Sequence, residues 1–430
     1  MYQEDGSSSV TTNSSPLQMM SPPPPGVTSP YPWLKELKPE ERGLCLIHLL
    51  LTCASHVATG SLENANLALD QISYLASPHG DTIQRIAFYF SRALADRLLR
   101  AWPGIYKAFH SSTNPYPLAQ EKFLARKMFS ECCLFMRVAF LIRNQAIMES
   151  MEGEKMVHVI DLCAAEPTQW CALIRDLSAR PQGPPHLRIT AIHQHKEVLD
   201  HMAHVLTEQA EKLDIPFQFN PVLSTIDRLD FEKLRVKTGE ALAVSSTLQL
   251  HTLLASQSNK YGIGSHLQRE LLNKDIDTFL SALRGLSPKV VVVTEQDSDH
   301  NGKNLMERLS GSLYFYAALF DCLESTLPRE SLQRLTMEKV LFGEEIKDII
   351  ACEGAERRER HESLGKWRRT FELAGFANVA SSYYSMLRAK RLVQSSSNCE
   401  GYRIKEENGC VVICWQDRPM YSVSAWRCKR

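Results

Sequence analysis

The chain has 430 residues, which is enough for one large domain or two closely packed ones. Lys and Arg together number 49, as do Asp and Glu, so the net charge gives no electrostatic case for binding nucleic acid or a membrane surface, although a local basic face remains open. We find neither an apolar run of roughly 18 residues nor a positive region followed by an apolar one at the start, and we expect no membrane helix and no secretory signal.

The first part of the chain divides into a tail and a helical region. Residues 1–40 are rich in Ser and Pro, and we expect them to form a disordered tail. Over residues 41–151 the apolar residues recur at helical spacing and no strand pattern interrupts them, which predicts an all-helical, leucine-rich cap. Within this cap, Gly60-Ser61 and Trp102-Pro103-Gly104 indicate helix breaks, and Asp81 is a candidate N-cap.

A strand that leads straight into a helix follows the cap. Residues 157–162 are mostly apolar and β-branched, which predicts a short buried strand. Residues 170–177 carry Trp, Leu and Ile at helical spacing. A strand that ends at Asp161 and passes through a tight loop into a helix is typical of the opening of a nucleotide-binding βαβ unit.

The loop of this unit lacks the residues that hold a nucleotide. Glycines normally let the backbone approach a phosphate, whereas this loop reads Cys163-Ala164-Ala165-Glu166-Pro167. Pro167 removes an N–H donor, and Glu166 places a negative charge where an anion would sit. The next predicted strand ends at His193-Gln194 rather than at an acid that could bind ribose hydroxyls. We therefore predict a degenerate loop after Asp161 and no cofactor.

Further strands follow at the spacing of an α/β fold. Continuous apolar runs such as Val290–Val293 imply burial on both faces, as in a parallel sheet. A polar stretch at residues 256–265 is expected to be a surface insertion. Helices are predicted near residues 305–323, 337–352 and 367–374, and those near 305–365 could add to the cap. The predicted strands after the first cover residues 187–192, 215–222, 241–245 and 289–294.

The last segment predicts antiparallel strands. Asn408-Gly409 is a two-residue hairpin signal between residues 402–406 and 410–415, and residues 421–426 supply another strand. The predicted elements together resemble the class I methyltransferase form of the doubly wound fold. We therefore predict an α/β, Rossmann-like core over residues 152–430, with an antiparallel C-terminal hairpin and the N-terminal all-helical cap.

Catalytic and metal-binding motifs are missing from the sequence. There is no Gly-x-Ser-x-Gly elbow, no Walker loop and no His-Glu-x-x-His. Pairs such as His193-x-His195 lack further ligands, and the twelve cysteines show no Cys-x2-Cys spacing, so we predict no metal site and reduced thiols. Glu295 and Asp297 follow a predicted strand and could be an acid pair or merely line the edge of the sheet. The basic residues from Arg357 onward alternate with acidic ones, which favours a solvated helical face over a phosphate site.

Several blocks resemble one plant family. Val157-His158-Val159-Ile160-Asp161 is similar to the VHIID motif that defines the GRAS proteins. The run Glu345–Gly354, the step Arg357-x-Glu359-Arg360 and the closing Ser424–Arg427 match further family blocks, and the resemblance covers about residues 40–430 in order. The residues that match family motifs are Val157, His158, Val159, Ile160, Asp161, Glu345, Arg357, Glu359, Arg360, Trp367, Trp415 and Trp426. We expect the shared scaffold to be formed, mostly as core, by Val157, His158, Ile160, Asp161, Trp170, Trp367, Trp415 and Trp426.

The resemblance implies a transcription regulator in the nucleus, and also in the cytoplasm, without a DNA-binding module of its own. Its implied partners are other GRAS proteins, including DELLA repressors, in homo- or heterodimers, and indeterminate-domain zinc-finger transcription factors. DNA would be reached mainly indirectly, and no membrane is involved. The Asp161–Pro167 variant resembles the Scarecrow-like branch, which is associated with gibberellin signalling and root development. Among exposed residues we expect Arg357, Arg358 and Arg360 to bind partners. The alternatives are a divergent S-adenosylmethionine-dependent methyltransferase and a direct DNA-binding factor.

Overall fold

The computed structural model describes residues 36–110, 119–255, 276–396 and 400–429, together with Tyr31 and Leu34. The predicted Ser/Pro-rich tail therefore lies almost entirely outside the described residues, and the predicted insertion at 256–265 lies wholly outside them.

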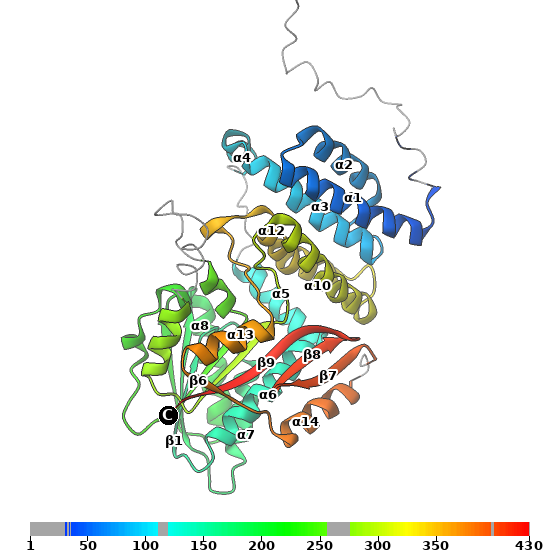
Figure 1. The fold of residues 1–430 in the computed structure, drawn as a ribbon. Coiled ribbons are helices and arrows are strands. Elements are labelled where there is room, and N and C mark those ends of the chain that lie inside the picture. The colour runs from blue at the N-terminus through cyan, green and yellow to red at the C-terminus, as the bar shows by residue number, and fades with distance from the viewer. Residues whose placement is uncertain are drawn as a thin grey trace, which may run out of the picture.

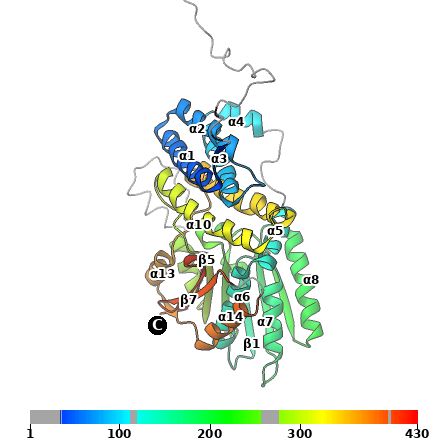
Figure 2. The same ribbon diagram turned by 90° about the vertical axis from the view of Figure 1, so that its right-hand side faces the viewer.

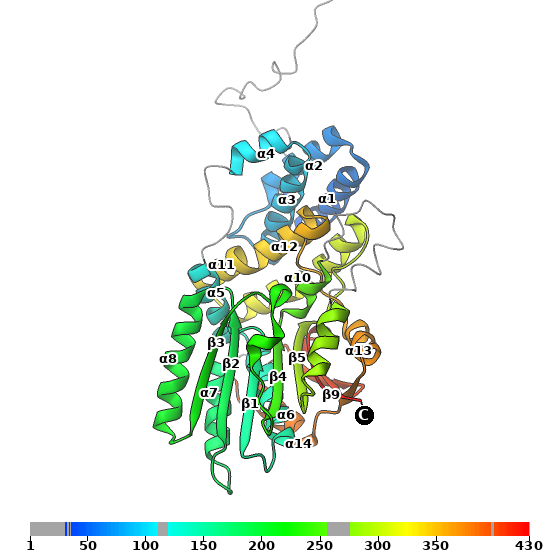
Figure 3. The same cartoon turned by 90° about the vertical axis from the view of Figure 1, so that its left-hand side faces the viewer.

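A nine-stranded sheet forms the centre of the molecule (Figures 1 and 3). Its strands are β1 (Met156–Asp161), β2 (His186–His193), β3 (Phe217–Leu223), β4 (Ala241–Thr247), β5 (Val290–Gln296), β6 (Phe376–Val379), β7 (Tyr402–Glu407), β8 (Cys410–Trp415) and β9 (Arg418–Cys428). The order is β3-β2-β1-β4-β5-β9-β8-β7, with β6 also paired to β9. The first five strands are parallel, whereas β9, β8 and β7 are antiparallel. This arrangement confirms the predicted Rossmann-like fold with its antiparallel C-terminal hairpin.

Both faces of the parallel strands are covered, as the apolar runs predict. In β5, Val290 and Val292 pack in one cluster with three helices, and Val291 and Val293 pack in another on the opposite face. The helices of the first face are α6 (Leu134–Ser150), α7 (Thr168–Ser178) and α8 (Lys196–Lys212). The opposite face is covered by the short 3-10 helix η5 (Leu250–Leu254), a helix that includes residues 276–285, and α13 (Leu364–Leu373).

The cap stands at one end of this sheet (Figures 1 and 2). It contains α1 (Pro39–Thr59), α2 (Leu62–Leu75), α3 (Thr82–Arg100), α4 (Pro103–His110), α10 (Leu305–Thr326), α11 (Leu332–Met337) and α12 (Gly343–Ala351). Helices α10 and α12 contact α3 and lie between the N-terminal helices and the sheet. Helix α5 (Ala119–Cys132) leads to α6, which contacts β5, β9 and α7, so the layer on the sheet begins before residue 151.

Local chemistry explains where the cap helices begin and end. Gly60 ends α1 at a φ of 74°, which glycine adopts without strain. The Asp81 side chain accepts a hydrogen bond from the Gln84 N–H at 3.0 Å and caps α3 as predicted. The predicted helix 337–352 starts at the last residue of α11, passes through a π-helical turn, Glu338–Phe342, and continues as α12. Gly343 follows this turn, and a Cβ there would lie 2.8 Å from the Tyr89 ring, so glycine permits the close approach of α12 to α3.

Helix α1 is the only helix among the described residues that is long and apolar enough to cross a membrane by length and composition alone. The sequence has no uninterrupted apolar run of roughly 18 residues, which predicts no such helix. A core helix passes the same test, and α1 buries Leu46, Leu50 and Cys53 in the main apolar cluster of the cap. Of the apolar stretch that meets the test, 28% is buried inside the protein.

The C-terminal hairpin follows its predicted turn chemistry. Asn408 and Gly409 have φ angles of 51° and 80°, and positive values at both positions are what a type I′ turn requires. Cys410 and Cys414 lie together in a small buried cluster with Val412 and Leu364, on the buried face that their spacing predicts. The hairpin thus extends the sheet and covers part of the cap helices with its apolar face.

Candidate functional site

The end of β1 holds the carboxylate that the sequence singles out. Asp161 is only 3% exposed, and its Oδ2 accepts a hydrogen bond of 2.7 Å from the indole N–H of Trp170. Its Oδ1 accepts another of 3.0 Å from the backbone N–H of Cys163. Burial raises the pKa of Asp161, although these hydrogen bonds and the nearby Arg143 act in the opposite direction. Both oxygens of the carboxylate therefore accept hydrogen bonds from the loop and the helix that follow β1.

A buried guanidinium fills the adjacent edge of the sheet. Arg143 of α6 is fully buried, and its Nη1 donates to Ser245 Oγ at 3.0 Å, to the Ser246 carbonyl at 3.3 Å and to Thr247 Oγ1. Its Nη2 donates to Gln169 Oε1 on α7. Burial lowers the pKa of Arg143 to about 10, so the guanidinium stays charged at neutral pH. The carboxyl edge where doubly wound folds bind cofactors is thus occupied by a side chain of the protein.

The degenerate loop itself packs onto the sheet. Ala164 is buried, and its N–H donates to the Ile192 carbonyl at 3.2 Å. The Cys163 thiol accepts from Gln249 Nε2 at 3.4 Å, and burial raises its pKa. Glu166 accepts a hydrogen bond of 2.6 Å from the Thr168 hydroxyl at the start of α7. These polar groups of the loop are engaged within the protein.

His158 lies inside the sheet rather than at its edge. Its Nδ1 accepts from the Arg188 guanidinium at 3.0 Å, which leaves Nε2 to donate to Thr190 Oγ1 at 2.8 Å. Glu240 lies 3.2 Å from Nδ1 and favours a charged ring, but burial and Arg188 outweigh it and lower the pKa of His158 to about 4. The imidazole is therefore neutral in the folded protein at neutral pH.

This neutral histidine should make the fold sensitive to acid. Because the folded pKa of about 4 lies below the ordinary value of roughly 6.5, His158 destabilises the fold as the pH falls through that interval, by about 1–3 kcal/mol in total. Urea unfolding at pH 7.5 and pH 5 should show a smaller loss of stability in His158→Gln than in the natural chain. Exposed His48→Gln is the control and should lose as much as the natural chain. An equal loss in all three proteins would contradict the assignment.

A second polar cluster lies beyond the end of β5. Glu295 is 2% exposed, and its Oε1 accepts from the backbone N–H groups of Gln249 at 3.1 Å and Leu250 at 2.8 Å. Its Oε2 lies 2.7 Å from His251 Nδ1, and His251 Nε2 lies 3.0 Å from Glu359 Oε2. Burial alone would lower the pKa of His251, but the two carboxylates raise it to about 10. Asp297, the other candidate acid, instead accepts from the Leu364 N–H at 2.9 Å.

The cluster continues into the segment that follows α12. His361 Nε2 lies 3.3 Å from Glu359 Oε2, and His361 Nδ1 lies 3.1 Å from His300 Nδ1. Burial and the charge of Glu359 raise the pKa values of Glu345 and Asp348 to about 7. The carboxylates of this region are therefore crowded and largely withdrawn from water.

Two of the three arginines expected to bind partners are buried. Arg357 is 5% exposed and donates to the His300 carbonyl at 3.2 Å, and Arg360 is 4% exposed and donates to the Gly354 carbonyl at 2.6 Å. The expectation of an exposed helical face is therefore wrong for them, because the segment is not helical beyond Glu356. The Arg357 side chain donates to carbonyls of the loop after β5, and the Arg360 side chain donates to a carbonyl of its own segment. Arg358 does expose about half of its side chain.

The scaffold tryptophans lie in the interior. Trp426 is fully buried and stacks on the Phe371 ring with centroids 4.7 Å apart, while its indole N–H donates to Ser424 Oγ at 2.9 Å. Trp415 donates from Nε1 to Asp321 Oδ2 at 2.7 Å and so joins the hairpin to α10. Trp367, on α13 itself, is 3% exposed and packs in the same apolar cluster as Trp426.

Sequence reasoning missed Arg143, His251, His300 and His361. Arg143 lies within a largely apolar helix that also carries the exposed Arg137, so its sequence does not mark it as buried, and the histidines come from separate segments without a motif. His193 and His195, which it did consider, contact each other at the end of β2, where the His193 ring accepts from the His195 N–H at 3.1 Å.

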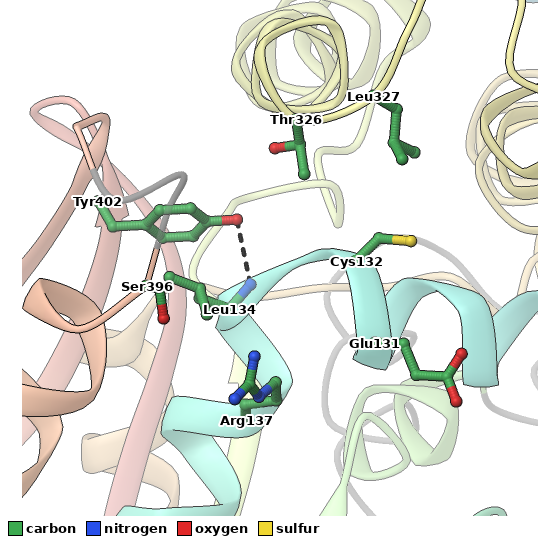
Figure 4. A pocket seen from close by; sticks show the side chains of 8 residues that line it. All are labelled: Glu131, Cys132, Leu134, Arg137, Thr326, Leu327, Ser396 and Tyr402. Carbon is green, nitrogen blue, oxygen red and sulfur yellow. Dashed lines mark hydrogen bonds between the residues drawn. The ribbon is translucent and has the colours of Figure 1, made fainter.

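Two hollows occur away from the carboxyl edge of β1 and β4. One has a volume of about 250 Å³, lies beside the α5–α6 junction and is lined by residues that include Glu131, Cys132, Arg137 and Tyr402 (Figure 4). The Tyr402 hydroxyl accepts from the Leu134 N–H at 3.1 Å at its wall. The other, of about 540 Å³, lies between the cap helices near Arg97 and Glu353. The residues that line them include none from the degenerate loop.

The chain is similar to one protein family over most of its length. The GRAS domain family model matches residues 46–427. The chain belongs to the GRAS family. It is 58% identical to Scarecrow-like protein 3 of Arabidopsis thaliana, over 94% of this chain and 93% of that protein. It is 34% identical to the DELLA protein GAI1 of Vitis vinifera, over 90% of this chain and 62% of that protein.

A solved GRAS structure supports the same assignment. The crystal structure of SCL7 in Oryza sativa superposes with a TM-score of 0.76 at 29% identity and covers 89% of this chain and 99% of that chain. The VHIID resemblance and the likeness to the Scarecrow-like branch are thereby confirmed. This GRAS protein is accordingly a plant transcription regulator of the Scarecrow-like type.

Proposed function

We propose that this GRAS protein is a nuclear transcriptional coregulator that acts by binding other proteins, in gibberellin signalling and root development. The filled edge beside Asp161 is the observation that carries the proposal. Arg143 and Trp170 use this edge for internal hydrogen bonds, so the polar groups at the ends of β1 and β4 are engaged. A Rossmann-like fold whose cofactor edge is filled by its own side chains acts through its outer surfaces.

The proposed partners follow from family membership. They are other GRAS proteins, including DELLA repressors, bound as homo- or heterodimers, and indeterminate-domain zinc-finger transcription factors. DNA is reached mainly through the zinc-finger partner, which agrees with the net charge of zero. The chain acts in the nucleus, with the cytoplasm as a second location.

An exposed apolar pair on α1 offers one surface for such a partner. Leu44 and Ile47 are 72% and 37% exposed and lie three residues apart, so they share one face of the helix. Exposed apolar residues at this spacing suit a partner helix. Arg358 remains the one exposed arginine of the three proposed for partner binding.

A binding experiment with purified proteins tests the proposal. The immobilised full chain should retain both a DELLA protein and an indeterminate-domain zinc-finger protein. If the α1 pair contacts the GRAS partner, Leu44→Glu combined with Ile47→Glu should weaken retention of the DELLA protein by about tenfold or more, because it places two charges in an apolar contact. Leu332→Glu, at the 76% exposed start of α11, is the matched control and should leave retention unchanged.

Two results would contradict the proposal. Retention of neither partner by the natural chain would remove protein binding as its mode of action. Specific binding of DNA by the chain alone, with an affinity that falls steeply as salt rises, would favour a direct DNA-binding factor.

A further inference from the structure

Three donor atoms of the polar cluster converge on one point. His251 Nε2, Glu359 Oε2 and His361 Nε2 all lie within 4.8 Å of one another. The two nitrogens are 3.0 Å and 3.3 Å from the carboxylate oxygen. Tetrahedral zinc with nitrogen and oxygen ligands at about 2.0–2.1 Å separates its ligand atoms by roughly 3.3 Å. These two separations are close to that ligand spacing, and all three donor atoms lie within 4.8 Å of one another.

We propose that His251, Glu359 and His361 form a site for a divalent cation of the zinc class, with its fourth position open to water. Two imidazoles and one carboxylate are a ligand set that suits zinc. Both histidines are buried, whereas the Glu359 side chain is 25% exposed and provides a route for the ion from solvent.

The hydrogen-bond partners of the two ligating imidazoles are of the kind found around metal sites. Glu295 lies 2.7 Å from His251 Nδ1 and accepts hydrogen bonds from two backbone N–H groups, which fix its position. It therefore orients the His251 ring so that Nε2 faces the proposed ion. His300 plays the corresponding part for His361, with their Nδ1 atoms 3.1 Å apart. A carboxylate behind a ligating imidazole raises its basicity as a ligand.

Further carboxylates lie near the ligands. Asp348 accepts hydrogen bonds of 2.8 Å from the backbone N–H groups of both Arg358 and Glu359, and Glu345 accepts one of 2.8 Å from the Tyr316 hydroxyl. In the absence of a metal, a proton on His251 Nε2 bridges to Glu359 Oε2. Zinc would replace that proton and bind all three side chains at once.

The site would link parts of the chain that are far apart in sequence. His251 belongs to η5, just after β4, whereas Glu359 and His361 lie in the irregular segment between α12 and α13. Bound zinc would therefore hold the segment that leaves the cap against the carboxyl edge of the sheet. This role is independent of the partners proposed above.

Titration of the purified full chain with Zn²⁺, and with Co²⁺ as a coloured probe, tests the site. We expect one ion per chain, a visible Co²⁺ absorption of the intensity typical of four-coordination, and a rise in Tm with Zn²⁺. His361→Gln and Glu359→Gln should each weaken Zn²⁺ binding by about a hundredfold or more, and Glu295→Gln by roughly 10–100-fold. His193→Gln, which removes a histidine outside the cluster, should leave binding unchanged.

Each other outcome counts against the proposal. No binding of Zn²⁺ by the natural chain overturns it, as does binding that His361→Gln and Glu359→Gln leave intact. If these variants do not fold, X-ray absorption of the zinc-loaded natural chain decides the question. Two imidazoles and oxygen ligands support the site, and sulfur ligands overturn it.

Discussion

Replacing Arg85 with Met is expected to lower the free energy of unfolding by about 3–5 kcal/mol, because the change breaks a buried ion pair. Arg85 is fully buried on α3, and its Nε donates to Glu338 Oε1 in the π-helical turn at 3.0 Å. It also pairs with Glu324 on α10. Met fills similar space but leaves Glu338, itself fully buried, with Arg334 at 3.3 Å as its remaining cation.

Urea unfolding of three variants measures this effect. Arg92→Met removes an exposed arginine from the same helix and should cost roughly 0.5 kcal/mol or less. The double change Arg85→Met with Glu338→Leu should recover part of the loss, since it removes the buried charge that the single change leaves behind. Similar costs for Arg85→Met and Arg92→Met would contradict the ion-pair explanation.

Arg143→Ala is expected to destabilise the fold by about 3–5 kcal/mol for a different reason. The substitution leaves a cavity at the edge of the sheet. It also strands the Ser246 carbonyl and the Gln169 side-chain oxygen, which accept from the guanidinium. Arg137→Ala, on an exposed face of the same helix, should cost roughly 0.5 kcal/mol or less.

Denaturant unfolding and a crystal structure of the variant would separate the two contributions. An Arg143→Ala protein as stable as Arg137→Ala would show that the guanidinium does not support the edge that it occupies. Collapse of the neighbouring helices into the space would lower the cost, whereas an open cavity would keep it high.

The sequence predicts the sheet well because its signals are local. The central parallel strands β4 and β5 are short runs of apolar and small residues, and burial on both faces leaves them without polar alternation. Asn408-Gly409 specifies its turn because both residues accept positive φ angles. Gly60 and Asp81 mark helix ends for equally local reasons.

Two elements carry too weak a local signal to be predicted. Strand β6 has four residues, and it is a strand only because it pairs with the end of β9. Helix α14 (Tyr383–Gln394) buries few residues, among them Met386, Ala389 and Val393, while Tyr383 is 82% exposed. In both cases the tertiary partner decides the conformation.

The site shows the same division between local and distant causes. The loss of glycine from the loop after Asp161 is a local signal that the sequence shows directly, whereas the hydrogen bond from the Cys163 N–H to this carboxylate is seen only in the structure. Charged residues are ordinarily exposed, so sequence alone places Arg357 and Arg360 on the surface. Their burial depends on carbonyls from His300 and Gly354, which only the fold brings near.

Calorimetric titration of the full chain with S-adenosylmethionine tests the central claim most directly. The claim is that Arg143 and the loop after Asp161 fill the edge where a doubly wound fold would hold a cofactor. We expect no heat of binding at ligand concentrations up to about 1 mM. Any dissociation constant would then be larger than that of a functional cofactor. Micromolar binding that S-adenosylhomocysteine displaces and Asp161→Asn abolishes would contradict it.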